Sequence, residues 1–106
     1  MPNVSQSDQC KPSVVIHYCT LCQWQLRSAW MAQELLQTFA DELYQVTLRP
    51  GTGGVFEIWV DEHLVWERKR DDGFPDPKEL KQRVRDVVSP DKSLGHIDRA
   101  REGEQN

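Results

Sequence analysis

The 106-residue sequence has no long apolar run, few cysteines and no excess of positive charge. No stretch approaches the roughly 20 consecutive apolar residues that a membrane-spanning helix needs, and the first residues lack the charged and apolar parts of a secretory signal. Three cysteines are too few, and odd in number, for a disulfide framework. A formal net charge of −4 argues against a general nucleic-acid binder. We therefore expect one cytoplasmic domain that uses neither a membrane nor nucleic acid as its partner.

The periodicity of apolar residues changes along the chain and predicts the order β-α-β-β-β-α. The expected elements are a strand over 13–18, a helix over about 20–40, strands over 44–49, 55–60 and 63–68, and a helix that begins after Asp76 and ends before Ser89. These elements form an α/β (α+β) domain with a four-stranded mixed sheet and two helices. We expect a flexible N-terminal segment over 1–12, the domain over 13–88 and a loosely held C-terminal tail over 89–106.

Each predicted helix has a sequence signature. In the first, residues spaced by three and four predict one apolar face; they are Cys22, Leu26, Ala29, Ala32, Leu36, Phe39 and Leu43. Trp24, Trp30 and Leu35 widen this face. The last helix has a capping box, in which Asp76 is the cap, Pro77 the first helical residue and Glu79 the third.

The connection to the third strand leaves two topologies open. The first two strands are expected to be parallel, with a right-handed crossover through the helix. The third strand either forms a hairpin with the second or crosses over to pair antiparallel with the first. In the second arrangement a loop containing Thr52, Gly53 and Gly54 passes over the carboxyl end of the first strand, where ligands tend to bind in open α/β sheets.

A Cys-x-x-Cys motif, Cys19 to Cys22, lies where the first strand meets the first helix. Two thiols at this spacing can close a disulfide, and the positive end of a helix stabilises a thiolate. In a chain with a βαβ pattern the motif indicates thioredoxin-like redox chemistry. The alternatives are two buried, inert cysteines or a soft-metal site, since a copper(I) carrier needs only two thiolates. Cys10, in the N-terminal segment, is expected to be an incidental thiol.

Three segments in order resemble the selenoprotein W-like family, in the Rdx group of thioredoxin-like proteins. They are Tyr18-Cys19-Thr20-Leu21-Cys22, the run from Gly51 to Ile58, and Arg70-Asp71-Asp72-Gly73-Phe74-Pro75. The resemblance covers roughly residues 13–88 and implies a thioredoxin-like sheet with the crossed topology. It also implies a cytosolic thiol-redox role tied to glutathione or peroxide defence.

The resemblance places the two cysteines in different roles. Cys19 matches the first cysteine of the family motif, and Cys22 matches the position at which some members carry selenocysteine. This precedent favours Cys22 as the nucleophile, whereas helix geometry and an expected greater exposure favour Cys19. We treat the two as a coupled pair and expect Cys19 to be the nucleophile. Larger thioredoxins carry a cis-proline before the third strand, where this chain has Gly53 and Gly54.

The leading hypothesis is a small thiol-disulfide oxidoreductase that uses Cys19 and Cys22 with glutathione or thiol protein substrates and needs no cofactor or metal. One alternative is a non-enzymatic module whose redox state controls docking to a protein partner, and another is a copper or zinc carrier. Trp24 is a candidate wall of the site. His17 is either an ordinary strand side chain or a group that tunes Cys19. The cluster from Arg68 to Arg70 is expected to be a solvated strand end, because Asp71 and Asp72 cancel most of its charge, with an anion- or partner-binding role as the alternative.

Overall fold

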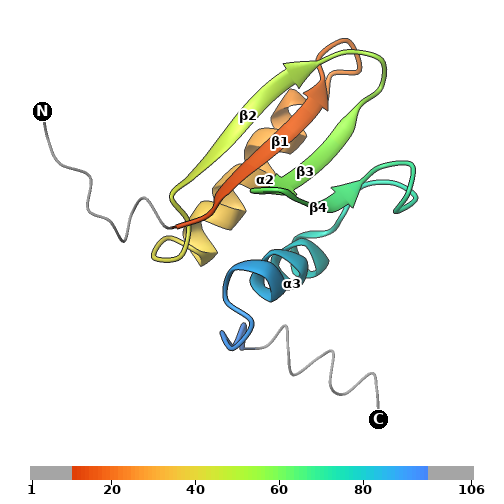
Figure 1. Cartoon of the computed structure of the whole chain (residues 1–106). Helices are drawn as coiled ribbons and strands as arrows, with labels where there is room; N and C mark the ends of the chain where they lie inside the picture. The colour runs from red at the N-terminus through yellow and green to blue at the C-terminus, as the bar shows by residue number, and fades with distance from the viewer. Residues whose placement is uncertain (1–10, 96–106) are drawn as a thin grey trace, which may run out of the picture.

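The computed structural model describes residues 11–95, which form a four-stranded sheet with both helices packed on one of its faces (Figure 1). The elements are β1 (Ser13–Cys19), α2 (Gln25–Thr38), β2 (Gln45–Gly51), β3 (Phe56–Val60), β4 (His63–Glu67) and α3 (Pro77–Val88). The predicted order β-α-β-β-β-α is confirmed. Within the described range, no helix combines the length and the apolar character needed to cross a bilayer.

The strands are arranged in the order β2-β1-β3-β4. β1 pairs in parallel with β2 and antiparallel with β3, and β3 pairs antiparallel with β4. The third strand therefore crosses over to the first, and the hairpin with the second strand is excluded. Pro50 does not stop β2, because this strand lies at the edge of the sheet, where the missing N–H of a proline is tolerated. The crossover brings the loop before β3 to the carboxyl end of β1.

One face of the sheet is buried and the other is open. On β1, Val14, Ile16 and Tyr18 are buried, while Val15 and His17 are half-exposed. β3 repeats this alternation, with Phe56, Ile58 and Val60 in the core. Figure 1 shows α2 behind β1 and β2, and α3 next to β4. The two helices and the sheet thus share a single core on one side.

Helix α2 begins five residues later than predicted and turns a different face to the sheet. Residues 20–23 form a turn in which the Gln23 N–H donates to the Thr20 carbonyl at 3.1 Å. Gln23 has φ +62°, a left-handed conformation that cannot continue a right-handed helix. The buried residues of α2 are Ser28, Met31, Ala32 and Leu35.

The predicted apolar face of this helix is only partly correct. Ala32, Phe39 and Leu43 are buried, but Leu26 is 80% exposed and Leu36 is 44% exposed. Of the residues predicted to widen this face, Leu35 is buried but Trp30 is 47% exposed, and Met31, which was not predicted, points to the core. Because apolar residues occur around much of this helix, the spacing alone does not determine which of them face the sheet.

Helix α3 begins as its capping box predicts. Asp76 accepts a hydrogen bond from the Glu79 N–H at 2.8 Å, and Pro77 is the first helical residue. Leu80 and Val84 are buried against the core. The chain beyond α3 stays on the domain as far as it is described, because the Lys92 ammonium lies 3.3 Å from the Glu42 carboxylate and Leu94 packs against the core. Cys10 and the predicted flexible segment up to residue 10 lie outside the described residues, as does the predicted tail from residue 96 onward.

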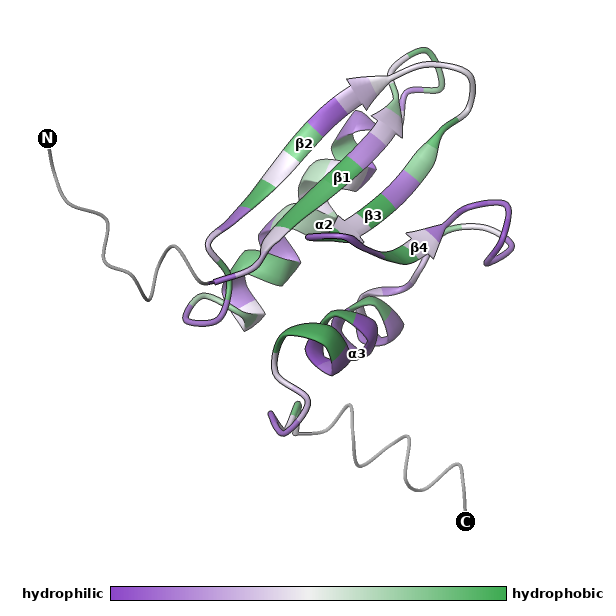
Figure 2. Cartoon of the chain, in the orientation of Figure 1, coloured by the Kyte–Doolittle hydropathy of each residue, from purple (hydrophilic) through white to green (hydrophobic). Residues whose placement is uncertain are grey.

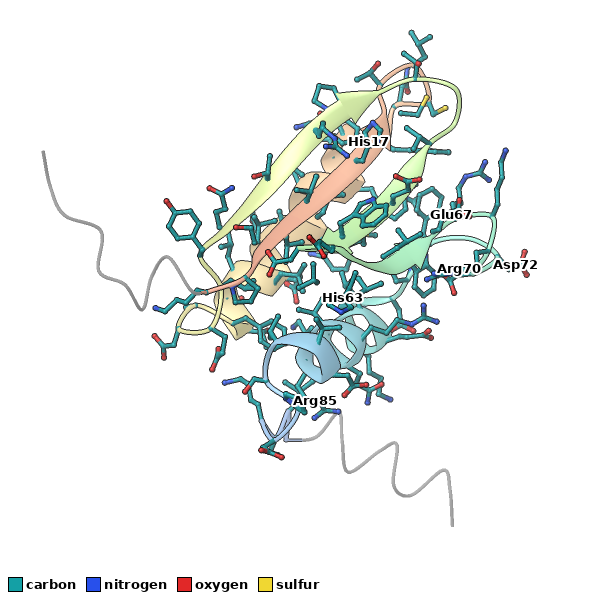
Figure 3. All side chains as sticks on the ribbon, viewed as in Figure 1. His17, His63, Glu67, Arg70, Asp72 and Arg85 are labelled. Carbon is teal, nitrogen blue, oxygen red and sulfur yellow. The ribbon has the colours of Figure 1, made fainter. Side chains whose placement is uncertain are left out.

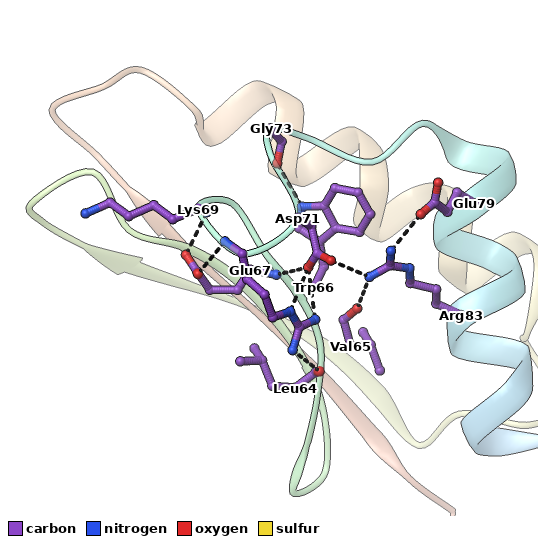
Figure 4. Close-up of polar contacts among 10 residues, drawn as sticks. Leu64, Val65, Trp66, Glu67, Lys69, Asp71, Gly73, Glu79 and Arg83 are labelled. Atoms are coloured by element: carbon purple, nitrogen blue, oxygen red, sulfur yellow. Dashed lines mark hydrogen bonds and ion pairs between the residues drawn. The ribbon is translucent and has the colours of Figure 1, made fainter.

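The loop between β4 and α3 is mostly hydrophilic (Figure 2) but is held in place by its own side chains. The Asp71 carboxylate accepts hydrogen bonds from the Glu67 N–H, from Arg70 and from Arg83 (Figure 4). The Trp66 indole N–H donates to the Gly73 carbonyl at 2.9 Å. This network fixes a segment that carries Arg68 and Phe74 toward the end of the sheet where the cysteines lie.

Candidate active site

The two cysteines lie side by side at the carboxyl end of β1. Cys19 is the last residue of this strand and Cys22 lies in the turn that follows. Both are free thiols, and the Cys22 Sγ donates to the Cys19 Sγ over 2.7 Å. Cys19 is buried, with 1% of its surface exposed, whereas Cys22 is exposed. The expectation that Cys19 is the more exposed sulfur is therefore wrong, because the end of a buried central strand lies under the following turn.

The environment separates the acidities of the two thiols. The hydrogen bond from Cys22 lowers the pKa of Cys19, and the backbone N–H groups of Gly54, Cys22 and Leu21 lower it further, against the effect of burial. The same hydrogen bond raises the pKa of Cys22, as do desolvation and the neighbouring Cys19, while the charge of Arg68 lowers it. The pair therefore holds its first negative charge on Cys19.

Backbone N–H groups, and not the N-terminus of a helix, stabilise the Cys19 thiolate. We expected the first turn of a helix to stabilise the thiolate, but α2 begins at Gln25, three residues after Cys22. The turn from Thr20 to Gln23 and the neighbouring loop supply the donors instead. The chemistry is that of an anion held by converging N–H groups.

The loop Thr52, Gly53 and Gly54 reaches the thiols as the crossed topology predicts. The Thr20 N–H and its hydroxyl both donate to the Gly51 carbonyl, at 3.1 and 3.2 Å, which ties this loop to the cysteine turn. Gly53 and Gly54 have φ values of +73° and +74°, a region that side chains rarely adopt. The Gly54 N–H faces both sulfurs. Thr52 is exposed, and no contact of its side chain with the thiols is seen.

Trp24 follows the turn and belongs to a cluster of three aromatic rings. Its ring lies edge-on to Phe74 at 4.9 Å and to Phe56 at 6.5 Å between centroids. The Arg68 guanidinium lies 5.2 Å from the Trp24 ring centroid, and its Nε donates to the Gly54 carbonyl at 3.4 Å. Trp24 thus packs under a cation that also contacts the glycine loop.

Arg68 is the residue whose place in this site the sequence pattern did not reveal. The run Arg68-Lys69-Arg70 suggested a solvated strand end, and Lys69 and Arg70 are indeed exposed. Arg70 pairs with Asp71 at 2.9 Å, whereas Arg68 turns toward Gly54 and Trp24. The contact depends on the antiparallel pairing of β4 with β3, which places the end of β4 beside the start of β3. No short-range motif encodes that register.

His17 lies on the open face of the sheet, toward the end where β1 and β2 terminate (Figure 3). Its Nδ1 is 3.6 Å from the Glu57 carboxylate. A Cβ atom placed on Gly51 would lie 2.4 Å from the His17 Nε2, so the imidazole fills the space that glycine leaves. His17 therefore packs against the root of the glycine loop, and no contact between it and either sulfur is seen.

The described residues contain no cluster of three or more side chains suited to a metal ion. A structural zinc site needs four ligands and a catalytic one needs three. Within residues 11–95 the thiol pair thus offers two sulfur ligands and no more, a set that suits only a soft, low-coordinate ion.

Known proteins resemble this chain across the whole domain. The sequence profile of the Rdx family matches residues 13–86. The crystal structure of a selenoprotein W-related protein from Vibrio cholerae is 53% identical, with a TM-score of 0.73, and the match covers 74% of this chain and 99% of that one. A Bordetella parapertussis protein of known structure is 59% identical, with a TM-score of 0.70, over 72% of this chain and 96% of its own. Among curated proteins, no sequence matches.

Proposed function

The chain belongs to the Rdx family and has its thioredoxin-like fold, and from this premise we propose that it is a small thiol-disulfide oxidoreductase with Cys19 and Cys22 as its reactive pair. Membership of this family suggests a redox-related role. The observation that carries the specific proposal is the approach of two free sulfurs to 2.7 Å with one of them exposed. We further propose that it works in the cytoplasm, where glutathione or a thioredoxin-type reductant supplies electrons.

Exposure favours Cys22 as the sulfur that meets the substrate. A thiolate must approach a disulfide sulfur in line, so access limits the rate together with acidity. Cys19 is the more acidic thiol but is buried. Cys22 is exposed and lies within the field of Arg68, which favours its thiolate. This assignment agrees with the selenocysteine position of the family.

The reaction runs in two exchange steps. Cys22 attacks one sulfur of the substrate disulfide as its proton passes to the Cys19 sulfur, and a mixed disulfide forms while the first substrate thiolate leaves. That thiolate takes the proton from Cys19, and the Cys19 thiolate then attacks the Cys22 sulfur. The Cys19–Cys22 disulfide closes and the second substrate thiolate leaves. The substrate gains two electrons and the protein loses them, and two molecules of glutathione or one dithiol reductant return the protein to its reduced state.

Trapping experiments test both the activity and the order of attack. Cys19→Ser should accumulate a mixed disulfide on Cys22 when it is treated with oxidised glutathione or a protein disulfide, whereas Cys22→Ser should react much more slowly at Cys19. Mass spectrometry of the adducts identifies the sulfur. Wild-type protein should also sustain disulfide reduction with glutathione as reductant. A mixed disulfide that forms only on Cys19 would contradict the proposed order of attack. Absence of turnover would contradict the proposed oxidoreductase activity.

A redox-dependent binding module is the second candidate, because one leucine inside the motif and another four residues after it face solvent. Leu21 is 84% exposed and Leu26 is 80% exposed. A protein that covers Cys22 would also cover Leu21, the residue before it. If the chain is a binding module, a partner should co-purify in one redox state and the protein should show no turnover. A soft-metal carrier would instead bind copper(I) tightly, one ion per chain, and would need both cysteines.

A further inference from the structure

Two arginine side chains lie on the aromatic cluster that borders the thiol pair. The Arg68 guanidinium carbon is 5.2 Å from the Trp24 ring centroid, and the Arg27 guanidinium carbon is 4.2 Å from that of Phe74. The two rings are themselves in contact, with centroids 4.9 Å apart. Stacking on an aromatic face holds a guanidinium in place without neutralising its charge. Two positive charges are therefore fixed on one small surface.

Neither guanidinium is paired with a carboxylate within residues 11–95. Arg70 and Arg83 pair with Asp71, and Lys81 pairs with Glu34. The hydrogen bond that Arg68 makes uses its Nε and a backbone carbonyl, which leaves its terminal nitrogens for other acceptors. Arg27 is exposed at the surface of α2. Both side chains can thus offer paired N–H donors to an incoming anion.

One of the two charges acts on the exposed sulfur, and the other lies on the neighbouring ring of the cluster. Arg68 is close enough to Cys22 for its charge to act on that thiol, and Trp24 is the second residue after Cys22. When a substrate disulfide reaches the Cys22 sulfur, the substrate atoms next to its reacting sulfur therefore come close to Arg68 and to the rings that carry both guanidinium groups. A carboxylate there gains charge-assisted hydrogen bonds, whereas an ammonium is repelled.

We propose that Arg68 and Arg27, held on Trp24 and Phe74, form an anion subsite that selects disulfide substrates with a carboxylate near the reacting sulfur. The proposal rests on the oxidoreductase function proposed above and names its substrate class. The chain as a whole carries a net charge of −4, which disfavours anions at long range. A preference for anionic substrates must therefore come from these local contacts.

Three small disulfides that differ in charge test the subsite. Reduced full-length protein is mixed with dithiodipropionate, which is anionic, with hydroxyethyl disulfide, which is neutral, and with cystamine, which is cationic. Each rate is divided by the rate of the same disulfide with free dithiothreitol, a neutral thiol, which removes intrinsic differences in reactivity. We expect the normalised rate for the anion to exceed that for the neutral disulfide by about fivefold, the size of a good solvent-exposed charge contact. Cystamine should be the slowest, and added salt should reduce the differences.

The matched variants are Arg68→Gln, Arg27→Gln and, as a control, Arg49→Gln. Because Arg68 also acts on the Cys22 thiol, the quantity compared is the ratio of anionic to neutral rates within each variant. Arg68→Gln and Arg27→Gln should each lower this ratio, and the double variant should bring it close to one. Arg49→Gln removes an exposed guanidinium on β2, at the opposite edge of the sheet from β4, and should leave the ratio unchanged.

The outcomes separate the two proposals. Equal normalised rates for all three disulfides, or an anion preference that survives the double variant, would overturn the subsite while leaving the oxidoreductase intact. Absence of exchange with any of the three disulfides would overturn the oxidoreductase and the subsite with it.

Discussion

Cys19 is the residue whose chemistry depends most on its immediate neighbours. Its pKa is lowered first by the Cys22 thiol and then by backbone N–H groups, and both effects need the turn that brings the two sulfurs to 2.7 Å. The sequence alone predicts that Cys19 and Cys22 are the reactive pair. It does not predict their burial or the assignment of the charge to Cys19, because these depend on backbone directions in residues 20–23.

The titration of the reduced protein tests this coupling. In a Cys10→Ser background, the first thiol proton should leave below the ordinary pKa of cysteine and the second above it, because the pKa of Cys19 is lowered and that of Cys22 is raised. Cys22→Ala should raise the lower pKa, since the donor to Cys19 is lost, while Cys22→Ser keeps a hydroxyl donor and should raise it less. Thiolate absorbance against pH is the measurement. Equal values for the Ala and Ser variants would contradict the role of the hydrogen bond.

Gln23 carries the backbone strain of the cysteine turn. Its φ of +62° costs a residue with a side chain about 1–2 kcal/mol, which glycine does not incur. Gln23→Gly should therefore leave the protein as stable as the wild type or raise its unfolding free energy by up to about 1 kcal/mol, after the entropy cost of glycine. Gln33→Gly, inside α2, should lower it by about 1 kcal/mol. Urea unfolding of both variants is the comparison, and equal losses would contradict the turn conformation.

The elements differ in how far their sequences specify them. β1 was predicted because its residues form a β-branched, apolar run, β3 because apolar residues alternate along it, and α3 because Asp76, Pro77 and Glu79 mark its start. The start of α2 was missed, since nothing in the residue types announces the left-handed Gln23. Short-range sequence patterns predict an element where its capping residues or apolar residues are distinctive. They do not predict the start of a helix that depends on a single backbone angle.

The junction of β1 and β2 depends on a small residue at Gly51. A Cβ atom there would lie 2.4 Å from the His17 Nε2 and 3.0 Å from the Val55 Cγ1. Gly51→Ala should thus lower the unfolding free energy by about 1–3 kcal/mol through overpacking. In the double variant with His17→Ala, part of that loss should be restored, because the imbalance in volume is removed. Strictly additive losses in the double-mutant cycle would show that the two residues do not meet.

The loop after β4 should fail first in acid. Hydrogen bonds from the Lys69 and Arg70 N–H groups lower the pKa of Glu67. Burial works to raise the pKa of Asp71, but hydrogen bonds from Glu67, Arg70 and Arg83 lower it overall. Carboxyl groups with lowered pKa values stabilise the folded state above their ordinary pKa, near 4, and this contribution is lost as pH falls through the folded values.

Asp71→Asn should remove part of this dependence on pH. At neutral pH we expect it to lower the unfolding free energy by about 1–3 kcal/mol, since it weakens hydrogen bonds to two arginines. The loss should shrink as pH falls toward 3. Asp72→Asn is the matched control, because Asp72 is exposed and asparagine tolerates its φ of +61°. An Asp71 variant that behaves like the control would contradict the network in Figure 4.

The molecule as a whole places its reactive chemistry at one end of a sheet with a single covered face. The resemblance to the selenoprotein W-like family, found from three short segments, is confirmed by the profile match and by the two bacterial structures. It supplied the crossed strand order that hydrophobic periodicity left open. It did not supply Arg27 or Arg68, nor the contacts by which they and Phe74 join α2, the end of β4 and the following loop across long stretches of chain. Such convergence is a property of the folded molecule and has no local sequence signal.

Peptide mass mapping after gentle oxidation tests directly whether Cys19 and Cys22 form a reversible disulfide. We expect the peptide containing residues 19–22 to lose the mass of two hydrogen atoms, and dithiothreitol to restore that mass. Cys19→Ser and Cys22→Ser should each abolish the change. A disulfide that forms through Cys10 instead, or a pair that stays reduced while the rest of the protein is intact, would contradict the proposed reactive pair.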